Sequence, residues 1–139
     1  MKANPALQYF QSGVPSFEIL HEALHSAIAS APKTTFIGAH VGGIPEDLQT
    51  LSQLLSELPN YFVDISARIA DLGRQPRAFS ALVEKHSDRI LFGTDYFPFS
   101  IEGIRKYFRF LETDDEYFSY DVNTSSPRSG RWNIYWSEN

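Results

Sequence analysis

Residues 34–66 read TTFIGAHVGGIPEDLQTLSQLLSELPNYFVDIS, and this stretch decides the fold. Its first part, residues 34–40, is short, rich in β-formers and not alternating, which is typical of a strand covered on both faces. Gly42 and Gly43 interrupt this strand. Residues 61–66 predict the next strand, so the stretch starts and ends in β-structure.

The segment between these two strands predicts a helix. Glu46 and Asp47 suit its positive N-terminal end, and Pro59 with Asn60 closes it. Leucines at three- and four-residue spacing form its apolar stripe: Leu48, Leu51, Leu54, Leu55 and Leu58. A strand, a helix and a strand in this order favour a right-handed crossover and parallel pairing.

The same alternation continues on both sides of this unit. Residues 15–30 predict an amphipathic helix, and its apolar stripe is Phe17, Leu20, Leu24, Ala27 and Ile28. Residues 76–86 predict a third helix and residues 89–93 a third strand. Ser100 can cap a fourth helix, on one side of which lie Ile104, Phe108 and Leu111. The expected fold is α/β, with three parallel strands and at least four flanking helices.

The spacing of the strands indicates a barrel type. Their centres, near Phe36, Val63 and Leu91, are separated by about one unit of a (β/α)₈ TIM barrel, which uses about 31 residues for each strand and helix. Three strands cannot close a barrel, so the expected architecture is a partial one. Residues 122–139 lose all periodicity and read as an irregular tail, which leaves residues 1–121 as the folded domain.

Composition narrows the class of partner. The 139 residues carry a net charge of −5 without a basic cluster, which disfavours nucleic acid and favours a small-molecule substrate. There is no cysteine, so a disulfide framework and a Cys-ligated zinc are excluded. Neither a signal peptide nor a membrane-spanning run is recognisable, and a cytoplasmic location is expected.

The candidate chemistry lies where the strands end, because parallel α/β proteins work at the carboxyl ends of their strands. His40 ends the first strand, residues 66–68 follow the second, and Asp95 follows the third. A histidine and an aspartate at one rim can share a metal ion, or can polarise a substrate and activate a water. Arg68 is a candidate for binding a substrate carboxylate.

Each of these residues also has a structural interpretation. His40 could hydrogen-bond a turn, and Asp95 could cap the turn that follows it. Arg68 could pair with Asp64 or Asp71. Asp64 is expected to be paired rather than catalytic, because a lone buried carboxylate is unfavourable.

A second motif, HEALH at residues 21–25, matches the HExxH pattern of zinc metallopeptidases. In such a site His21 and His25 bind zinc and Glu22 acts as the general base. Ile28 and Ala31 replace the glycine and the third histidine of the longer metzincin pattern. The usual interpretation of these residues is the polar edge of a helix.

Four blocks in order carry a resemblance to a known family: TTFIGAHVGGIPEDL, PNYFVDISARIADLGRQPRAF, DRILFGTDYFP and YFRFLETDDEYFSY. Together they resemble the C-terminal part of amidohydrolase-related proteins, a branch of the metal-dependent TIM-barrel hydrolases and decarboxylases. The resemblance implies that the three strands are strands six to eight of the barrel. It implies that His40 and Asp95 are catalytic and metal-binding, with zinc or manganese as the cofactor. The implied reaction is hydrolysis of a C–N, C–O or lactone bond, or nonoxidative decarboxylation of a small organic acid.

The sequence also departs from that family. The H-x-H pair of the first barrel strand has no counterpart, since the histidines are His21, His25, His40 and His86. A truncated form with an incomplete metal site is therefore expected. The alternative is a non-catalytic half-barrel that self-associates as a homo-oligomer or needs an N-terminal partner.

Overall fold

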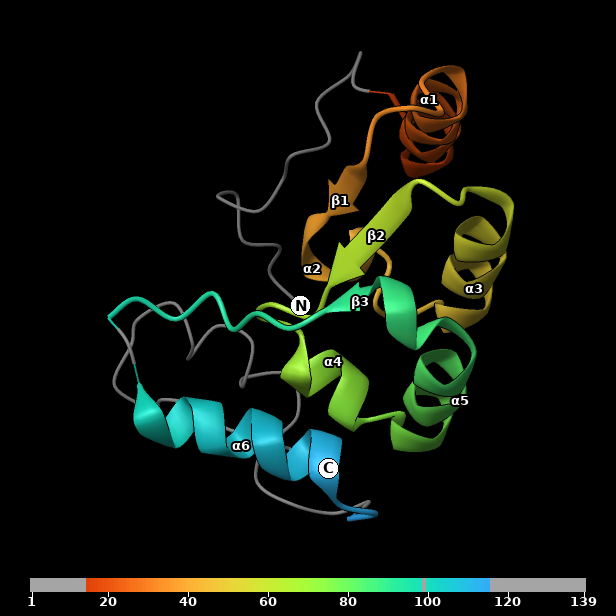
Figure 1. Cartoon of the computed structure of the whole chain (residues 1–139). Coiled ribbons are helices and arrows are strands. Elements are labelled where there is room, and N and C mark those ends of the chain that lie inside the picture. Colours follow the sequence, from red (N-terminus) through yellow and green to blue (C-terminus); the bar gives the residue numbers. More distant parts are fainter. Residues whose placement is uncertain (1–14, 99, 116–139) are drawn as a thin grey trace, which may run out of the picture.

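Three parallel strands form the centre of the protein (Figure 1). The computed structural model describes residues 15–98 and 100–115. Its strands, in their order across the sheet, are β1 (Phe36–Gly38), β2 (Tyr61–Asp64) and β3 (Ile90–Leu91). Phe36 is paired with Tyr61, and Val63 with Ile90. The prediction of three parallel strands is confirmed, and the described sheet is a partial one.

Helices alternate with these strands, as predicted. They are α1 (Phe17–Ser30), α2 (Ala39–Gly42), α3 (Leu48–Glu57), α4 (Ile69–Gly73), α5 (Pro76–His86) and α6 (Ile101–Glu112), with the 3₁₀ turn η2 (Ser87–Arg89) before β3. Ser16, Asp47 and Ser100 cap α1, α3 and α6, because their side chains accept hydrogen bonds from backbone N–H groups of the first turn. The short helix α4 was not predicted, since five residues are too few for a periodic signal.

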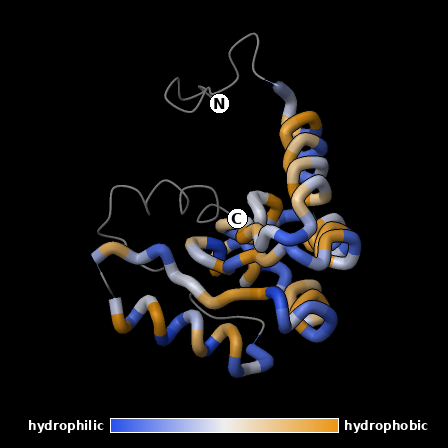
Figure 2. Tube along the Cα trace, turned by 45° about the horizontal axis from the view of Figure 1, so that its top comes forward, coloured by the Kyte–Doolittle hydropathy of each residue, from blue (hydrophilic) through white to orange (hydrophobic). Residues whose placement is uncertain are grey.

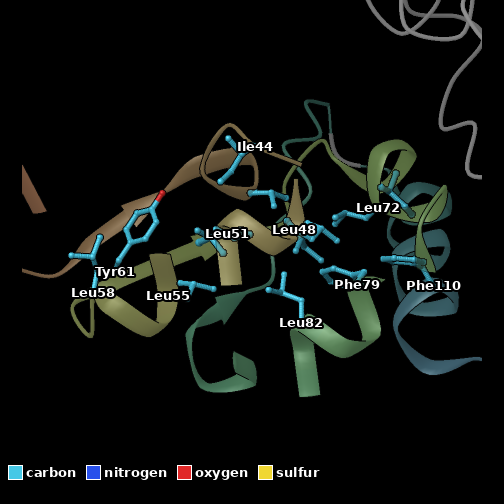
Figure 3. Close-up of a cluster of buried hydrophobic side chains, with 14 of the residues drawn as sticks. Ile44, Leu48, Leu51, Leu55, Leu58, Tyr61, Leu72, Phe79, Leu82 and Phe110 are labelled. Atoms are coloured by element: carbon cyan, nitrogen blue, oxygen red, sulfur yellow. The ribbon is translucent and has the colours of Figure 1, made fainter. Parts of the chain in front are cut away.

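The core lies between the sheet and α3, α4, α5 and α6 (Figure 3). Its fully buried side chains include Leu51, Leu55, Leu72 and Val63, and the Phe79 and Phe110 rings stack with their centroids 5.2 Å apart. The leucine stripe expected on α3 is buried as predicted, apart from Leu54, which is half-buried. This packing holds the sheet rigid from one side.

The opposite face of the sheet is open in the described part of the chain. The strand register places Ile37, Phe62, Asp64 and Leu91 on this face, because Phe62 and Asp64 pair with Ile37 and Leu91. Ile37 is 59% exposed and Leu91 is 37% exposed. The first strand was expected to be covered on both faces. This expectation is wrong for Ile37, since the three described strands form no closed barrel. We call this surface the open face.

Helix α1 also differs from expectation. Of its predicted apolar stripe only Ile28 is buried, whereas Phe17 and Leu20 are each 52% exposed. Figure 2 shows α1 standing away from the body of the molecule with apolar positions along its length. The helix is fixed at its C-terminal end, where the Asn60 amide donates hydrogen bonds to the carbonyls of Ile28, Ala31 and Thr34.

Helix α6 packs through a different side from the one expected. Gly103, Tyr107 and Phe110 are its buried residues, while Phe108 and Leu111 are exposed. A Cβ atom at Gly103 would lie 2.3 Å from the Tyr96 ring, so a glycine is needed at this contact. Among the described helices, none has both the length and the apolarity that crossing a membrane requires.

Candidate functional site

The loops that follow the three strands are joined to one another at their carboxyl ends. His40, just after β1, contacts the carbonyl of Ser66 after β2 through its ring. The N–H of Ala67, also after β2, donates to the carbonyl of Thr94 after β3, at 3.2 Å. These contacts assemble the rim that the sequence predicts as the working edge.

Backbone strain is concentrated at this rim. Among the described residues, the non-glycine residues with positive φ are His40 (57°), Val41 (61°), Ala67 (54°) and Asp95 (58°), and each follows one of the strands. Gly42 and Gly43 continue the left-handed conformation of His40 and Val41, so α2 contains a left-handed turn. A strained residue of this kind costs on the order of 1–3 kcal/mol and is typical of functional sites.

His40 lies in α2, beyond the end of β1 at Gly38, and not within the strand as expected. Its Nδ1 is 2.9 Å from the Ser66 carbonyl oxygen. A carbonyl oxygen only accepts, so Nδ1 carries the proton and donates it. Within the described residues Nε2 makes no hydrogen bond, which leaves it as a ligand or proton acceptor. The ring is thus bound through Nδ1 to the loop after β2, while Nε2 stays available for the functional role that the sequence predicts.

Asp64 is bound by backbone groups. Its Oδ1 accepts hydrogen bonds from the N–H of His40, at 3.0 Å, and from the N–H of Ser66, at 2.9 Å. Burial acts to raise the pKa of this carboxyl, but the hydrogen bonds from His40 and Ser66 outweigh burial and hold the pKa below its ordinary value. Asp64 is paired as expected, although its partners belong to the backbone of the rim.

Asp95 lies in the neighbouring loop and is exposed. Among the described residues, no hydrogen bond or ion pair connects its carboxylate with His40. Within the described ranges its carboxylate accepts no hydrogen bond from the turn that follows it, whereas the Thr94 Oγ1 accepts one from the N–H of Tyr96. The structure thus brings His40 together with Asp64 and Ser66, and it joins the loop of Asp95 to them through Thr94.

Arg68 makes the structural contact that the sequence offered as an alternative. Its Nη1 is 3.5 Å from Oδ2 of Asp71, and the other oxygen of Asp71 lies 2.8 Å from Arg74. Arg68 immediately precedes α4, one residue after the strained Ala67. A guanidinium is therefore present beside the rim, with a carboxylate that partly neutralises it.

The HEALH residues lie on α1, away from this rim. His25 Nε2 is 3.3 Å from Oε2 of Glu57 on α3, and the His21 ring contacts the Phe17 ring at 4.2 Å between centroids. In the described ranges, no group of three or more His, Cys, Asp or Glu residues could hold a metal ion. A catalytic zinc ordinarily takes three protein ligands, so neither α1 nor the rim forms a complete metal site from described residues.

Glycines allow the rim to form. A Cβ at Gly38 or Gly42 would lie 2.1 or 2.5 Å from the Tyr61 hydroxyl, and Tyr61 is buried. A Cβ at Gly93 would lie 2.3 Å from Ser66 Oγ. The Gly42-Gly43 pair was the signal in the sequence for a left-handed turn, but it did not reveal that the turn begins at His40.

A family model described as amidohydrolase matches residues 9–117. Neither the curated proteins nor the solved structures gave a match.

Proposed function

This chain belongs to the amidohydrolase family, and we propose that its rim performs metal-dependent chemistry on a small organic molecule. The reaction is hydrolysis of a C–N, C–O or lactone bond, or nonoxidative decarboxylation of a small organic acid. In this proposal β1, β2 and β3 are strands six to eight of a (β/α)₈ barrel, whose active sites lie at the carboxyl ends of the strands.

One observation carries the proposal: the positive-φ residues cluster at the rim. Val41 is β-branched and especially unfavourable in this conformation. Such strain persists only where the surrounding structure enforces it, and it is most often found at active sites and ligand clamps. The open face, in contrast, shows apolar exposure without this strain.

We assign His40 the role of ligand or base. Because Nδ1 donates to Ser66, the lone pair of the neutral ring is on Nε2. That lone pair can bind a metal ion or accept a proton, and a protonated Nε2 can donate to a substrate oxygen. The hydrogen bond at Nδ1 fixes the ring in the way that partners of catalytic and metal-binding histidines do.

We assign Asp95 the role of accepting a proton from the attacking water, or of binding metal. Its exposed carboxylate can do either without first breaking an ion pair among the described residues. Arg68 is proposed to bind a carboxylate of the substrate. It would do so while sharing its charge with Asp71, 3.5 Å away.

Zinc or manganese is the proposed cofactor because of the family. The described residues do not fit a complete site, since His40 and Asp95 supply at most two ligands. A complete metal site would need protein ligands beyond these two. Proton transfer by His40 and Asp95 and orientation of a substrate by Arg68 are the roles that the described residues can perform without it.

An activity assay tests this proposal. The full chain, supplied with Zn²⁺ or Mn²⁺, is assayed against aryl amides, aryl esters and lactones, and for CO₂ release from aromatic and unsaturated acids. Turnover should fall about 10²-fold or more in His40→Asn and in Asp95→Asn, as expected for loss of a proton-transfer group. The matched controls His25→Asn and Asp88→Asn should keep the parent rate. Equal rates in all four variants would contradict the assignment.

The open face favours a second candidate function. Ile37 and Leu91 are exposed on a parallel sheet, although parallel sheets are ordinarily covered on both faces. We propose as the alternative that the chain is a non-catalytic half-barrel, covered by an identical copy or by an N-terminal partner. Absence of turnover with either metal, together with self-association, would support this alternative.

A further inference from the structure

We infer that Asp64 is a positioning residue that holds the His40 ring through the backbone of the rim. The inference deepens the proposed function and rests on it for the importance of His40. The geometry itself stands without any metal or substrate. Asp64 would touch neither the substrate nor the reacting atoms.

Asp64 holds two backbone N–H groups through a single carboxylate oxygen. One oxygen, Oδ1, accepts from the N–H of His40 at 3.0 Å and from the N–H of Ser66 at 2.9 Å. The two N–H groups lie at the ends of neighbouring strands, 26 residues apart along the chain. Bonds from N–H groups to an ionised carboxylate are about twice as strong as neutral ones. Asp64 therefore fastens the end of β1 to the end of β2.

The same carboxylate also determines where the His40 ring lies. His40 is the first residue of the left-handed turn, and its N–H is the group that Asp64 holds. Ser66 supplies the carbonyl that accepts from Nδ1, and its own N–H is also held by Asp64. Both partners of the ring contact are thus fixed by the same carboxylate. Loss of the carboxylate should release the strained turn and the ring together.

His86 provides an internal reference with the opposite tautomer. Its Nδ1 is 3.0 Å from Nη2 of Arg89, and a guanidinium only donates, so Nδ1 of His86 carries no proton. Its Nε2 carries the proton, 3.0 Å from Ser52 Oγ. His40 and His86 should therefore show opposite ring tautomers in the same sample.

The test is ring and amide ¹⁵N NMR of the full chain at neutral pH, without metal. Three variants are compared with the parent: Asp64→Ala, Asp64→Asn and Asp47→Ala. Asp47 is the matched control, because its carboxylate also accepts a backbone N–H, that of Thr50 at 2.9 Å, but at the start of α3. The Asn side chain keeps an acceptor oxygen while losing the charge.

In the parent, His40 should be the Nδ1–H tautomer and His86 the Nε2–H tautomer. Asp64→Ala should abolish the dominance of the Nδ1–H tautomer at His40 and speed amide exchange of His40 about tenfold. Asp64→Asn should keep the tautomer but shift the amide protons of His40 and Ser66 to higher field. Asp47→Ala should leave His40 unchanged, and His86 should keep its tautomer throughout.

Three results would overturn the inference. The first is an Nε2–H tautomer at His40 in the parent. The second is an unchanged pair of amide resonances at His40 and Ser66 in Asp64→Asn, which decides the question if Asp64→Ala does not fold. The third is a loss of the His40 tautomer in Asp47→Ala, since this would make the effect a general response to destabilisation. None of these depends on whether the chain catalyses a reaction.

Discussion

Nδ1 of His40 lies 2.9 Å from the carbonyl oxygen of Ser66, and this contact joins the ends of two parallel strands. It also determines which nitrogen of the ring stays available at the rim. A residue that the sequence placed at the end of a strand is thus held by the neighbouring strand.

Alanine substitutions at the two glycines of the left-handed turn, Gly42 and Gly43, should lower stability by different amounts. Gly42 and Gly43 both have positive φ, but only Gly42 is close to a side chain, the hydroxyl of Tyr61. Gly43→Ala should cost about 1 kcal/mol of unfolding free energy from backbone strain alone. Gly42→Ala should cost about 1–3 kcal/mol more, because buried Tyr61 must move. Urea unfolding of both variants measures the difference, and equal losses would show that Tyr61 yields freely.

The free energy of unfolding should decrease as the pH is lowered below about 6.5, the ordinary pKa of histidine. His86 is 2% exposed, and burial, with Arg89 and Lys85 next in effect, lowers its pKa. Between the lowered and the ordinary pKa the unfolded chain binds more protons than the folded one, so stability is lost as pH falls. One such group contributes up to about 1.4 kcal/mol per pH unit. Urea unfolding at a series of pH values measures the slope.

The matched variants for this pH dependence are His86→Gln and His21→Gln. The first should flatten the slope between pH 6.5 and the lowered pKa, because the titrating group is gone. The second should keep the slope of the parent. A slope that survives unchanged in His86→Gln would assign the pH dependence to other groups.

Arg89 should be important for the stability of the α3–α5 packing. Its guanidinium donates to the carbonyls of Leu55 and Leu58 at the end of α3 and to Nδ1 of His86. Arg89→Met should lower the free energy of unfolding by about 2–3 kcal/mol, because these acceptors lose a charged donor. Arg105→Met, at an exposed position of α6, should change it by less than about 0.5 kcal/mol. Similar values for the two variants would contradict this role.

The open face should control association. The double variant Ile37→Ser, Leu91→Ser removes its exposed apolar side chains and should shift the chain toward the monomer in sedimentation velocity. Phe97→Ser is the control, because Phe97 is fully exposed but lies in the loop after β3. It should leave the association state unchanged. A parent chain that is monomeric at every concentration would remove the self-associating form of the alternative function.

Local signals predicted much of the fold. Helix α5 has the expected bounds because Pro76 suits a first helical turn and apolar residues recur at helical spacing. Ser100 caps α6 as predicted, because capping depends on neighbouring residues only. The prediction of which side of α6 is buried was wrong. Tyr107 and Gly103 lie on the buried side because they contact Tyr96. Such contacts depend on residues that come together only in the fold.

The site was predictable to a smaller extent. The alternation of strands and helices placed Asp95 after the third strand and His40 at the end of the first, whereas β1 in fact ends at Gly38. The left-handed conformation of His40 and Val41 could not be predicted, because glycine is the residue that ordinarily indicates a positive φ in a sequence. The double hydrogen bond of Asp64 also could not be read, since both of its partners are backbone N–H groups. The catalytic roles of His40 and Asp95 remain predictions.

The most direct test of the central claim is a Zn²⁺ titration of the full chain, followed by the ring ¹⁵N resonances of all four histidines. With at most two ligands from the described residues the binding should be weak, but Nε2 of His40 should respond first. Asp95→Asn should weaken that response, while His21, His25 and His86 stay unchanged. A response at His21 and His25 without one at His40 would contradict the account and would instead favour a metal site on α1.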